Sequence, residues 1–219
     1  METWLDCLRD QRAIAVLRTD DLHQARQTAQ ALAAGGLRSL EITWNSAQPA
    51  TLLAQLREDL PHCWLGVGTI LDAEQLDQAI AAGSQFVFCP HGNPALIAAA
   101  RQAGVPIVPG ALSPTEIITA WQAGASAVKV FPVQALGGAD YIRCLQGPLG
   151  QIPLIPTGGV TLANAPDLIA AGAIAVGMSS QLLPPALIAQ GDWGAIAQRT
   201  HTLLASLRAT PPATKSAEA

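Results

Sequence analysis

Short apolar runs alternate with alanine-rich helical stretches along nearly the whole chain. Five of these stretches end in the same way, with an Ala-Gly pair followed at once by a β-type run. The pairs are Ala34-Gly35, Ala82-Gly83, Ala103-Gly104, Ala123-Gly124 and Ala171-Gly172. Glycine just past a helix permits a left-handed conformation that ends it, so each pair predicts a junction from helix to strand. The junctions recur at one or two units of about 24 residues, which indicates a structural repeat.

Two junctions that the spacing requires are present in a weaker form, at residues 59–62 and 150–153, where proline or glycine breaks the pattern. Together with an opening apolar run at 13–17, they complete eight strand–helix units. The predicted strands cover residues 13–18, 37–43, 63–67, 85–89, 106–108, 126–131, 153–156 and 173–177. Eight such units with nearly continuous apolar strands predict an α/β protein, a (β/α)8 TIM barrel with a short N-terminal helix near residues 2–10.

One domain accounts for all the predicted elements. The last helix is expected to end near Leu207, and residues 211–219 predict a disordered tail. We therefore expect a single barrel domain over residues 1–210, a length that this fold accommodates. The segment Ser113-Pro114-Thr115-Glu116 is typical of a helix start with a capping box, so Glu116 is expected to be structural.

Composition and charge narrow the function classes. Half of the 219 residues are hydrophobic and 13% are charged, so the chain can bury a large core. A net charge of -4 without a basic run argues against a nucleic-acid or membrane surface, and no apolar stretch has the length of a transmembrane helix. The first residues carry acid where a signal peptide carries base, and the four cysteines form no CxxC pair. We expect a cytoplasmic protein with reduced thiols.

The first 200 residues contain a single lysine, and it lies in a predicted strand. Lys129 belongs to the apolar run 125–132, which ends at a proline. Desolvation disfavours the charged ammonium form there, and a neutral amine can attack a carbonyl carbon to form a Schiff base. The alternative is a lysine that reaches solvent or pairs with one carboxylate for structural reasons.

Glu41 resembles Lys129 in its position, because it is the one acid inside the apolar run 37–44. Burial raises the pKa of a carboxyl group and makes it a useful general acid and base near neutral pH. The alternative is an ion pair between Glu41 and Lys129 that holds the barrel interior together. A buried ion pair is a weak stabiliser, and this favours the catalytic interpretation.

Further candidates lie where the predicted strands end, the rim at which active sites of this barrel form. Arg18, Thr69 and Pro90 end or follow three of the strands, and Phe131 comes two residues after Lys129. The candidates that follow the last two strands are Thr157, Gly158, Gly159, Gly177, Ser179 and Ser180. Glycine lets the backbone N–H groups approach an anion, and serine hydroxyls add hydrogen bonds, so these two turns predict a phosphate site.

No metal or other cofactor is expected. The four histidines show no metal-ligand spacing, and only His91 lies at the predicted rim, either as a loop residue or as a neighbour of the substrate. Cys89 is expected to belong to the core of its strand rather than to act as a nucleophile.

Four segments resemble, in order and spacing, the signature segments of the KDPG/KHG aldolases, the bacterial 2-keto-3-deoxy-6-phosphogluconate and 4-hydroxy-2-oxoglutarate aldolases. They are Leu40-Glu41-Ile42-Thr43, Gly66-Val67-Gly68-Thr69-Ile70, Val128-Lys129-Val130-Phe131-Pro132 and Pro156-Thr157-Gly158-Gly159-Val160. The resemblance implies a homotrimeric, metal-independent class I aldolase with a small phosphorylated keto-acid as substrate. It implies Lys129 as the Schiff-base lysine and Glu41 as the acid and base. It also implies Thr69 as a pyruvate-binding residue, Pro90 and Phe131 as pocket walls, and the two glycine turns as the phosphate site.

The chain departs from the family pattern at two positions. Many members have an arginine where Asn45 stands, and the resemblance implies that this arginine contacts the substrate carboxylate; Arg18 is the candidate to replace it. Many members also have glutamate at the position of Gln134. The pair Asn45-Ser46 is similar to the sister enzymes that cleave the galactonate-derived substrate, so the preferred sugar epimer stays open.

The function predicted from the sequence is reversible cleavage of 2-keto-3-deoxy-6-phosphogluconate to pyruvate and glyceraldehyde 3-phosphate, with 4-hydroxy-2-oxoglutarate as a second substrate. One alternative is an aldolase for 2-keto-3-deoxy-6-phosphogalactonate. A second is a phosphate-sugar isomerase or a barrel like thiamine-phosphate synthase, which shares the glycine turns but requires no strand lysine. A third is a barrel that binds a phosphorylated ligand without catalysis.

Overall fold

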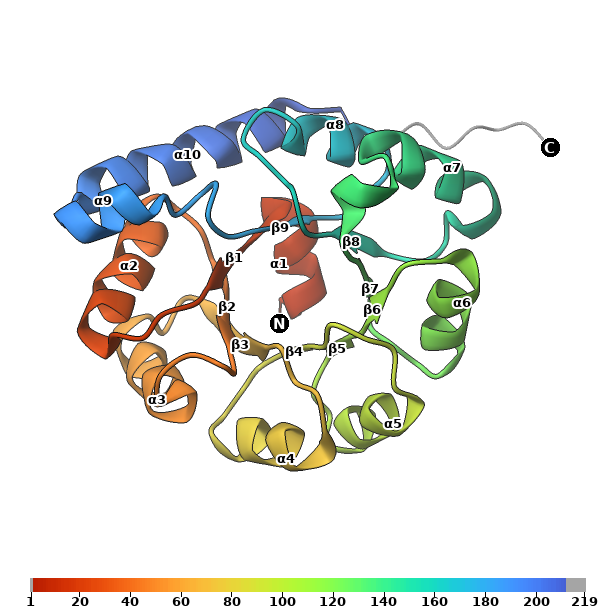
Figure 1. Ribbon diagram of the computed structural model, residues 1–219, viewed down its shortest axis with the longest axis horizontal. Helices are drawn as coiled ribbons and strands as arrows, with labels where there is room; N and C mark the ends of the chain where they lie inside the picture. The colour runs from red at the N-terminus through yellow and green to blue at the C-terminus, as the bar shows by residue number, and fades with distance from the viewer. Residues whose placement is uncertain (1, 212–219) are drawn as a thin grey trace.

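Parallel strands form the inner layer of the structure, and helices cover its outside (Figure 1). The computed structural model describes residues 2–211, so the predicted tail, apart from Pro211, lies outside the described residues. The strands curl around a central space, and each helix follows its strand around the ring (Figure 1). This curled, mixed α/β arrangement confirms the predicted class.

The strands are short and follow the predicted apolar runs. In residues 2–211 they are β1 (Ala13–Leu17), β2 (Ser39–Thr43), β3 (Trp64–Gly68), β4 (Val87–Phe88), β5 (Ile107–Val108), β6 (Gly110–Ala111), β7 (Val128–Val130), β8 (Leu154–Pro156) and β9 (Val176–Met178). The helices are α1 (Trp4–Gln11), α2 (Leu22–Ala34), α3 (Pro49–Asp59), α4 (Ala73–Ala81), α5 (Pro94–Gln102), α6 (Pro114–Gln122), the 3-10 helix η1 (Val133–Leu136), α7 (Ala139–Leu149), α8 (Ala165–Ala170), α9 (Pro185–Gln190) and α10 (Trp193–Ala209).

The strands pair in parallel within two sheets, in the orders β5-β4-β3-β2-β1-β9 and β6-β7-β8. β5 and β6 are separated by Pro109, which has no N–H group to donate to a neighbouring strand. The carbonyl of Pro109 nevertheless accepts a hydrogen bond of 2.9 Å from the N–H of Lys129. A parallel bridge between Thr157 and Gly177 connects the end of β8 to β9. The predicted strand at 106–108 is therefore one half of an interrupted strand.

The Ala-Gly junctions end the helices as predicted, with one shift. Four of the predicted glycines have a left-handed φ, and they are Gly83, Gly104, Gly124 and Gly172. At the first junction the left-handed residue is Gly36 (φ 95°), whereas Gly35 keeps a φ of −72°. Gly35 is needed for a different reason, because a Cβ at this position would overlap Thr200 of α10.

Helix α1 lies across the centre of the ring and closes one of its ends (Figure 1). Its Trp4 side chain is buried, stacks on Phe86 with ring centroids 4.4 Å apart, and meets Phe88 edge-on at 6.0 Å. The indole N–H of Trp4 donates to the Ser39 hydroxyl at 3.0 Å, so its one polar group is satisfied. These aromatic rings fill the interior of the ring below Lys129, whose Nζ lies 5.9 Å from the Phe88 ring centroid.

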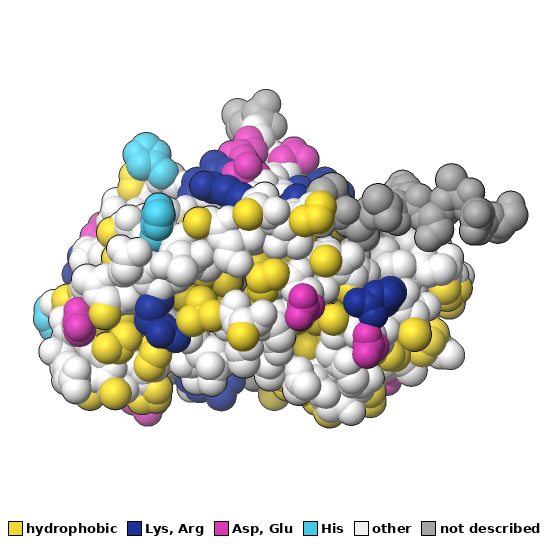
Figure 2. Space-filling view, turned by 90° about the horizontal axis from the view of Figure 1, so that it is seen from above, with side chains coloured by type: hydrophobic (Ala, Val, Ile, Leu, Met, Phe, Trp, Pro, Cys, Tyr) yellow, Lys and Arg dark blue, Asp and Glu magenta, His cyan; other side chains and the backbone are white. Residues whose placement is uncertain are grey.

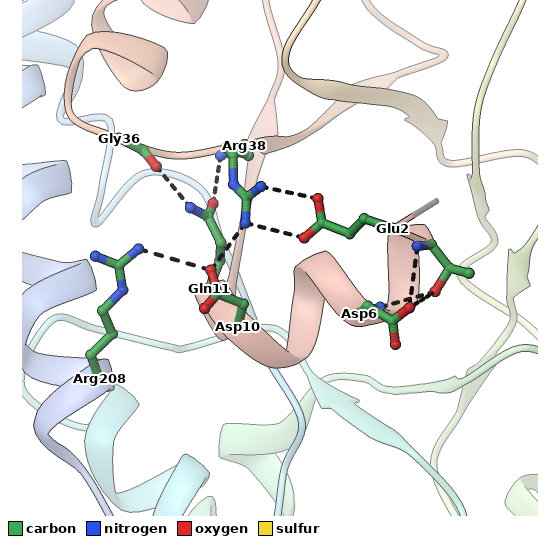
Figure 3. Close-up of polar contacts among 8 residues, drawn as sticks. Glu2, Asp6, Asp10, Gln11, Gly36, Arg38 and Arg208 are labelled. Atoms are coloured by element: carbon green, nitrogen blue, oxygen red, sulfur yellow. Dashed lines mark hydrogen bonds and ion pairs between the residues drawn. The ribbon is translucent and has the colours of Figure 1, made fainter.

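A polar network fixes α1 to the loop that precedes β2 (Figure 3). The Gln11 side chain donates to the Gly36 carbonyl at 2.8 Å and accepts from the Arg38 N–H at 2.5 Å. Arg38 in turn pairs with Glu2 and with Asp10. Since these contacts lie at the N-terminal ends of the strands, α1 closes the end of the ring opposite to the C-terminal rim.

Charges of both signs are mixed on the face of the molecule that Figure 2 shows. In the edge-on view, basic and acidic side chains lie next to each other, and no continuous basic area is visible among the coloured residues of this face (Figure 2). Within residues 2–211, none of the helices has both the length and the apolar character needed to span a lipid bilayer.

Candidate active site

A cavity of about 530 Å³ opens at the C-terminal ends of the strands, and it collects every predicted site residue. Its lining includes Arg18, Glu41, Thr69, Pro90, Lys129, Phe131, Thr157, Gly158, Gly159, Gly177, Ser179 and Ser180. These residues come from strands that are far apart in the sequence. The parallel direction of the strands brings their C-terminal ends to one rim, and this explains the convergence.

Lys129 is 7% exposed and lies in the middle of β7 with its ammonium or amine group in the cavity. Its Nζ is 4.9 Å from the centroid of the Phe131 ring and 5.9 Å from that of Phe88, so aromatic faces surround it on two sides. Among residues 2–211, no carboxylate lies within ion-pair distance of Lys129. The structural ion pair with Glu41, the alternative drawn from the sequence, is therefore absent from this geometry.

Glu41 lies on β2 and is 2% exposed. Burial raises the pKa of its carboxyl group, while the positive charges of Lys129 and Arg18 lower it to a smaller extent. Gly68, on the neighbouring strand β3, provides the space for this side chain, because a Cβ at position 68 would overlap the carboxylate. The result is a carboxyl group that keeps its proton to a higher pH than an exposed glutamate does.

Thr69 has a left-handed backbone with a φ of 63° directly after β3. A β-branched residue in this region is strained by about 1–3 kcal/mol, and such strain concentrates at functional sites. The conformation places a threonine, with its hydroxyl group, on the cavity wall between Glu41 and Pro90 in strand order. We infer that the chain tolerates the strain because it positions this side chain.

Arg18 and Lys129 are the two cationic residues of the cavity lining. Arg18 is exposed and has no ion-pair partner among residues 2–211, and in particular it does not pair with Asp20 or Asp21. The Asp21 carboxylate instead accepts from the Gln24 N–H at the start of α2. Arg18 is thus free to meet an anion, whereas Asn45 is exposed and lies outside the cavity lining.

The two glycine turns form the opposite side of the cavity. Gly158 and Gly159 both have a left-handed φ, of 88° and 82°. The N–H groups of Gly159, Val160, Ser179 and Ser180 donate to no protein acceptor within residues 2–211. Unpaired N–H groups on a glycine turn are the usual donors for a phosphate oxygen.

Several cavity residues escaped the sequence reasoning. They are Val16, Thr43, Val160, Thr161 and Gln181. Thr43 follows Glu41 by two residues on the same strand, and the period of two in a strand is the signal that could have identified it. The Thr43 hydroxyl is hydrogen-bonded to Ser46 at 3.0 Å, and Ser46 accepts from the Thr19 N–H, so this chain of contacts ties the loop after β2 to the loop after β1.

Three further residues near the rim lie outside the main cavity. His91 lines a neighbouring cavity of about 330 Å³ rather than the main one, and the two cavities share Pro90 and Phe131. Cys89 is buried, and burial raises the pKa of its thiol to about 12, so it stays protonated and unreactive near neutral pH. Glu116 accepts from the N–H groups of Leu112 and Ser113 in the predicted capping box.

Residues 2–211 contain no cluster of three potential metal ligands.

Comparison with known proteins adds a family to this geometry. The family model described as KDPG and KHG aldolase matches residues 5–199. A curated relative, the 2-dehydro-3-deoxy-phosphogluconate aldolase of Treponema pallidum, is 37% identical over 203 residues, which cover 91% of this chain and 97% of the relative.

Solved structures of the same kind share the fold. A KDPG aldolase from Legionella pneumophila, solved with pyruvate captured as a covalent carbinolamine intermediate, aligns with a TM-score of 0.85 and 26% identity over 91% of this chain and 97% of its own. A structure described as native KDPGal aligns with a TM-score of 0.82 and 30% identity, and the alignment covers 90% of this chain and 94% of that one.

The raised pKa of Glu41 predicts how stability depends on pH. The native state keeps a proton that the unfolded chain releases above pH 4.5, the ordinary value for this group. This contribution to stability is fully present below that pH and is lost as the pH rises through the folded pKa. Glu41→Gln removes the titration, so the melting temperature of the variant relative to the parent should increase as the pH rises above 4.5.

Thermal denaturation at a series of pH values measures this difference. Glu58→Gln, which changes an exposed glutamate on α3, is the matched control and should show no such trend. A difference between Glu41→Gln and the parent that stays constant with pH would contradict the raised pKa.

Proposed function

The chain belongs to the KDPG and KHG aldolase family, and we propose that it cleaves 2-keto-3-deoxy-6-phosphogluconate reversibly to pyruvate and glyceraldehyde 3-phosphate. The observation that carries the proposal is one cavity in which a buried lysine, a buried carboxyl group of raised pKa and a glycine turn with unpaired N–H groups meet. A Schiff-base aldolase requires these three elements, a nucleophile, a proton carrier and an anchor for the phosphate.

In the proposed reaction, the neutral amine of Lys129 attacks the C2 ketone of the substrate and forms a carbinolamine. Glu41 donates a proton to the departing hydroxyl group, and loss of water gives the protonated imine. The Glu41 carboxylate then takes the proton of the C4 hydroxyl as the C3–C4 bond breaks. The electrons of that bond move into the imine, which releases the aldehyde and leaves the enamine of pyruvate. Protonation at C3 and hydrolysis release pyruvate and regenerate the amine.

The two ends of the substrate carry negative charge and require different contacts. We assign the carboxylate to Thr69 and Arg18, because Arg18 lines the cavity without a protein partner. The phosphate is assigned to the turns at Gly158-Gly159 and Gly177–Ser180, where unpaired backbone N–H groups are available. Pro90 and Phe131 are assigned to the pocket wall around the reacting carbons.

A second candidate substrate is the galactonate epimer. The pair Asn45-Ser46 favours it, and so does the likeness to the KDPGal structure. Ser46 is tied to Thr43 on the cavity wall, so the loop that carries Asn45 is positioned by residues that the substrate can contact. Turnover of both epimers under the same conditions, coupled to pyruvate detection, decides between them. Cleavage of 4-hydroxy-2-oxoglutarate is the further activity proposed for the same lysine.

We also propose that the two sheets act as one closed (β/α)8 barrel. The single residue between β5 and β6 and the bridge from Thr157 to Gly177 support continuity around the ring.

A homotrimer is proposed as the assembled form. The exposed apolar side chains of Leu112 and Phe131, beside the smaller cavity, support an interface at this part of the rim. The four free cysteines support the expected cytoplasmic location.

The Schiff-base step predicts a covalent adduct. Incubation with pyruvate and borohydride should reduce the imine and attach the pyruvate carbon skeleton irreversibly to Lys129. Intact-protein mass spectrometry followed by peptide mapping locates the modification. Lys129→Met should show no adduct and no turnover under the same conditions. An adduct confined to Lys215, the other lysine of the sequence, would reject the proposed nucleophile.

The position of Arg18 predicts its effect on substrate binding. Arg18→Ala removes a charged contact to the substrate and should raise KM by about tenfold or more, while the melting temperature changes little because Arg18 is exposed and unpaired. Arg9→Ala removes an exposed arginine from α1 at the opposite end of the barrel and is the control. An unchanged KM together with a lower melting temperature would show that Arg18 is structural. Asn45→Ala tests the alternative that Asn45, at the position where many family members have arginine, makes this contact instead.

A further inference from the structure

The turn at residues 157–161 is held by hydrogen bonds to three successive carbonyl groups. The Thr157 carbonyl accepts from the Val133 N–H at 2.9 Å, and the Gly158 carbonyl accepts from the Gln134 N–H at 3.2 Å. The Gly159 carbonyl accepts from the Nδ2 of Asn164 at 3.1 Å. Two of these donors are backbone groups of η1, and the third is a side chain.

These bonds set the direction of the N–H groups on the turn. In a planar trans peptide, the C=O of one residue and the N–H of the next point in opposite directions. Gln134 and Asn164 are not part of the cavity lining, whereas Gly158, Gly159 and Val160 are. Carbonyls that point toward Gln134 and Asn164 therefore turn the N–H groups of Gly159 and Val160 toward the cavity.

Asn164 contacts the turn with both ends of its side-chain amide. Its Nδ2 donates to the Gly159 carbonyl, and its Oδ1 accepts from the Thr161 N–H at 2.7 Å. The Asn164 backbone N–H donates to the Thr161 hydroxyl at 3.1 Å, which fixes Asn164 itself. The Gln134 Oε1 lies 3.4 Å from Nδ2, and a Cβ on Gly159 would overlap the Gln134 side chain.

A glycine turn benefits from such a clamp. Glycine allows a wide range of ψ, so the Gly159 side of the Gly159–Val160 peptide does little to fix the tilt of the peptide plane. A complete flip is opposed by Val160, because a β-branched residue resists a positive φ, but a tilt within the range allowed to Val160 would swing the N–H group away from an anion. Since no cationic side chain of the cavity lies in this turn, the orientation of the backbone dipoles sets how strongly a phosphate is attracted.

We propose that Asn164 is a positioning residue that locks the Gly159–Val160 peptide with its N–H toward the cavity, assisted by Gln134, and so determines affinity for the phosphate end of the substrate. The proposal rests on the proposed function for the identity of that substrate. It separates the phosphate end from the reacting carbons, because Asn164 contacts neither Lys129 nor Glu41.

Binding of inorganic phosphate, followed by titration calorimetry on the whole chain, tests the clamp without requiring turnover. Asn164→Ala should weaken phosphate binding by about tenfold, the effect of losing one or two hydrogen bonds. In kinetics, KM for 2-keto-3-deoxy-6-phosphogluconate should rise by a similar factor with kcat nearly unchanged. KM for 4-hydroxy-2-oxoglutarate, which has no phosphate, should stay constant. Asn93→Ala removes the asparagine at the N-cap position of α5, outside the cavity lining, and should change none of these values.

The outcomes separate the clamp from the aldolase assignment. Absence of turnover with every keto-acid would reject the proposed function, while the phosphate titration would still test the clamp. Equal phosphate affinity in the parent and in Asn164→Ala, no phosphate binding to the parent, or an equal rise of KM for both substrates would overturn the clamp. If Asn164→Ala fails to fold, Gln134→Ala replaces it, because that side chain is exposed. It should weaken phosphate binding by about threefold, and an unchanged affinity would overturn the proposal.

Discussion

The common direction of the strands is the constraint on which the site depends. Because every strand pairs in parallel with its neighbours, all C-terminal ends meet at one rim, and residues near or just after these ends line the cavity. Glu41 on β2 and Lys129 on β7 belong to different sheets in the hydrogen-bond pattern, yet they open into the same cavity. A single antiparallel strand would carry its last residues to the end that α1 occupies. The chemistry is therefore a consequence of topology before it is a consequence of any particular residue.

The rim concentrates features that destabilise a fold, and the opposite end concentrates features that stabilise it. At the rim, Glu41 is desolvated and Thr69 has a strained backbone. At the other end, Trp4 is buried against two phenylalanines with its N–H satisfied. Gln11 joins α1 to the loop before β2 (Figure 3). This separation keeps the closing helix away from the reacting groups while it supplies burial that the open rim lacks.

Local signals in the sequence predicted the features that depend on local physics. Left-handed glycines followed from the Ala-Gly pairs, and the capping box at Ser113 followed from its residue pattern. Long-range contacts were not accessible in the same way. The stacking of Trp4 on Phe86 and the shift of the first junction to Gly36 each depend on how distant segments pack. Asn164 escaped for the same reason, since its importance lies in the direction of a peptide plane, which residue identity does not reveal.

The distribution of charge around the cavity explains why the backbone matters at its phosphate side. A substrate with a carboxylate and a phosphate carries several negative charges, but the cavity lining offers two cationic side chains, Arg18 and Lys129. In the proposed reaction Lys129 attacks as the neutral amine, so Arg18 is the remaining positive charge of the lining. On this proposal the phosphate is held by oriented N–H groups, whose partial charges do not change with pH. The oriented turn and the charge of Arg18 are in this sense two parts of one electrostatic arrangement.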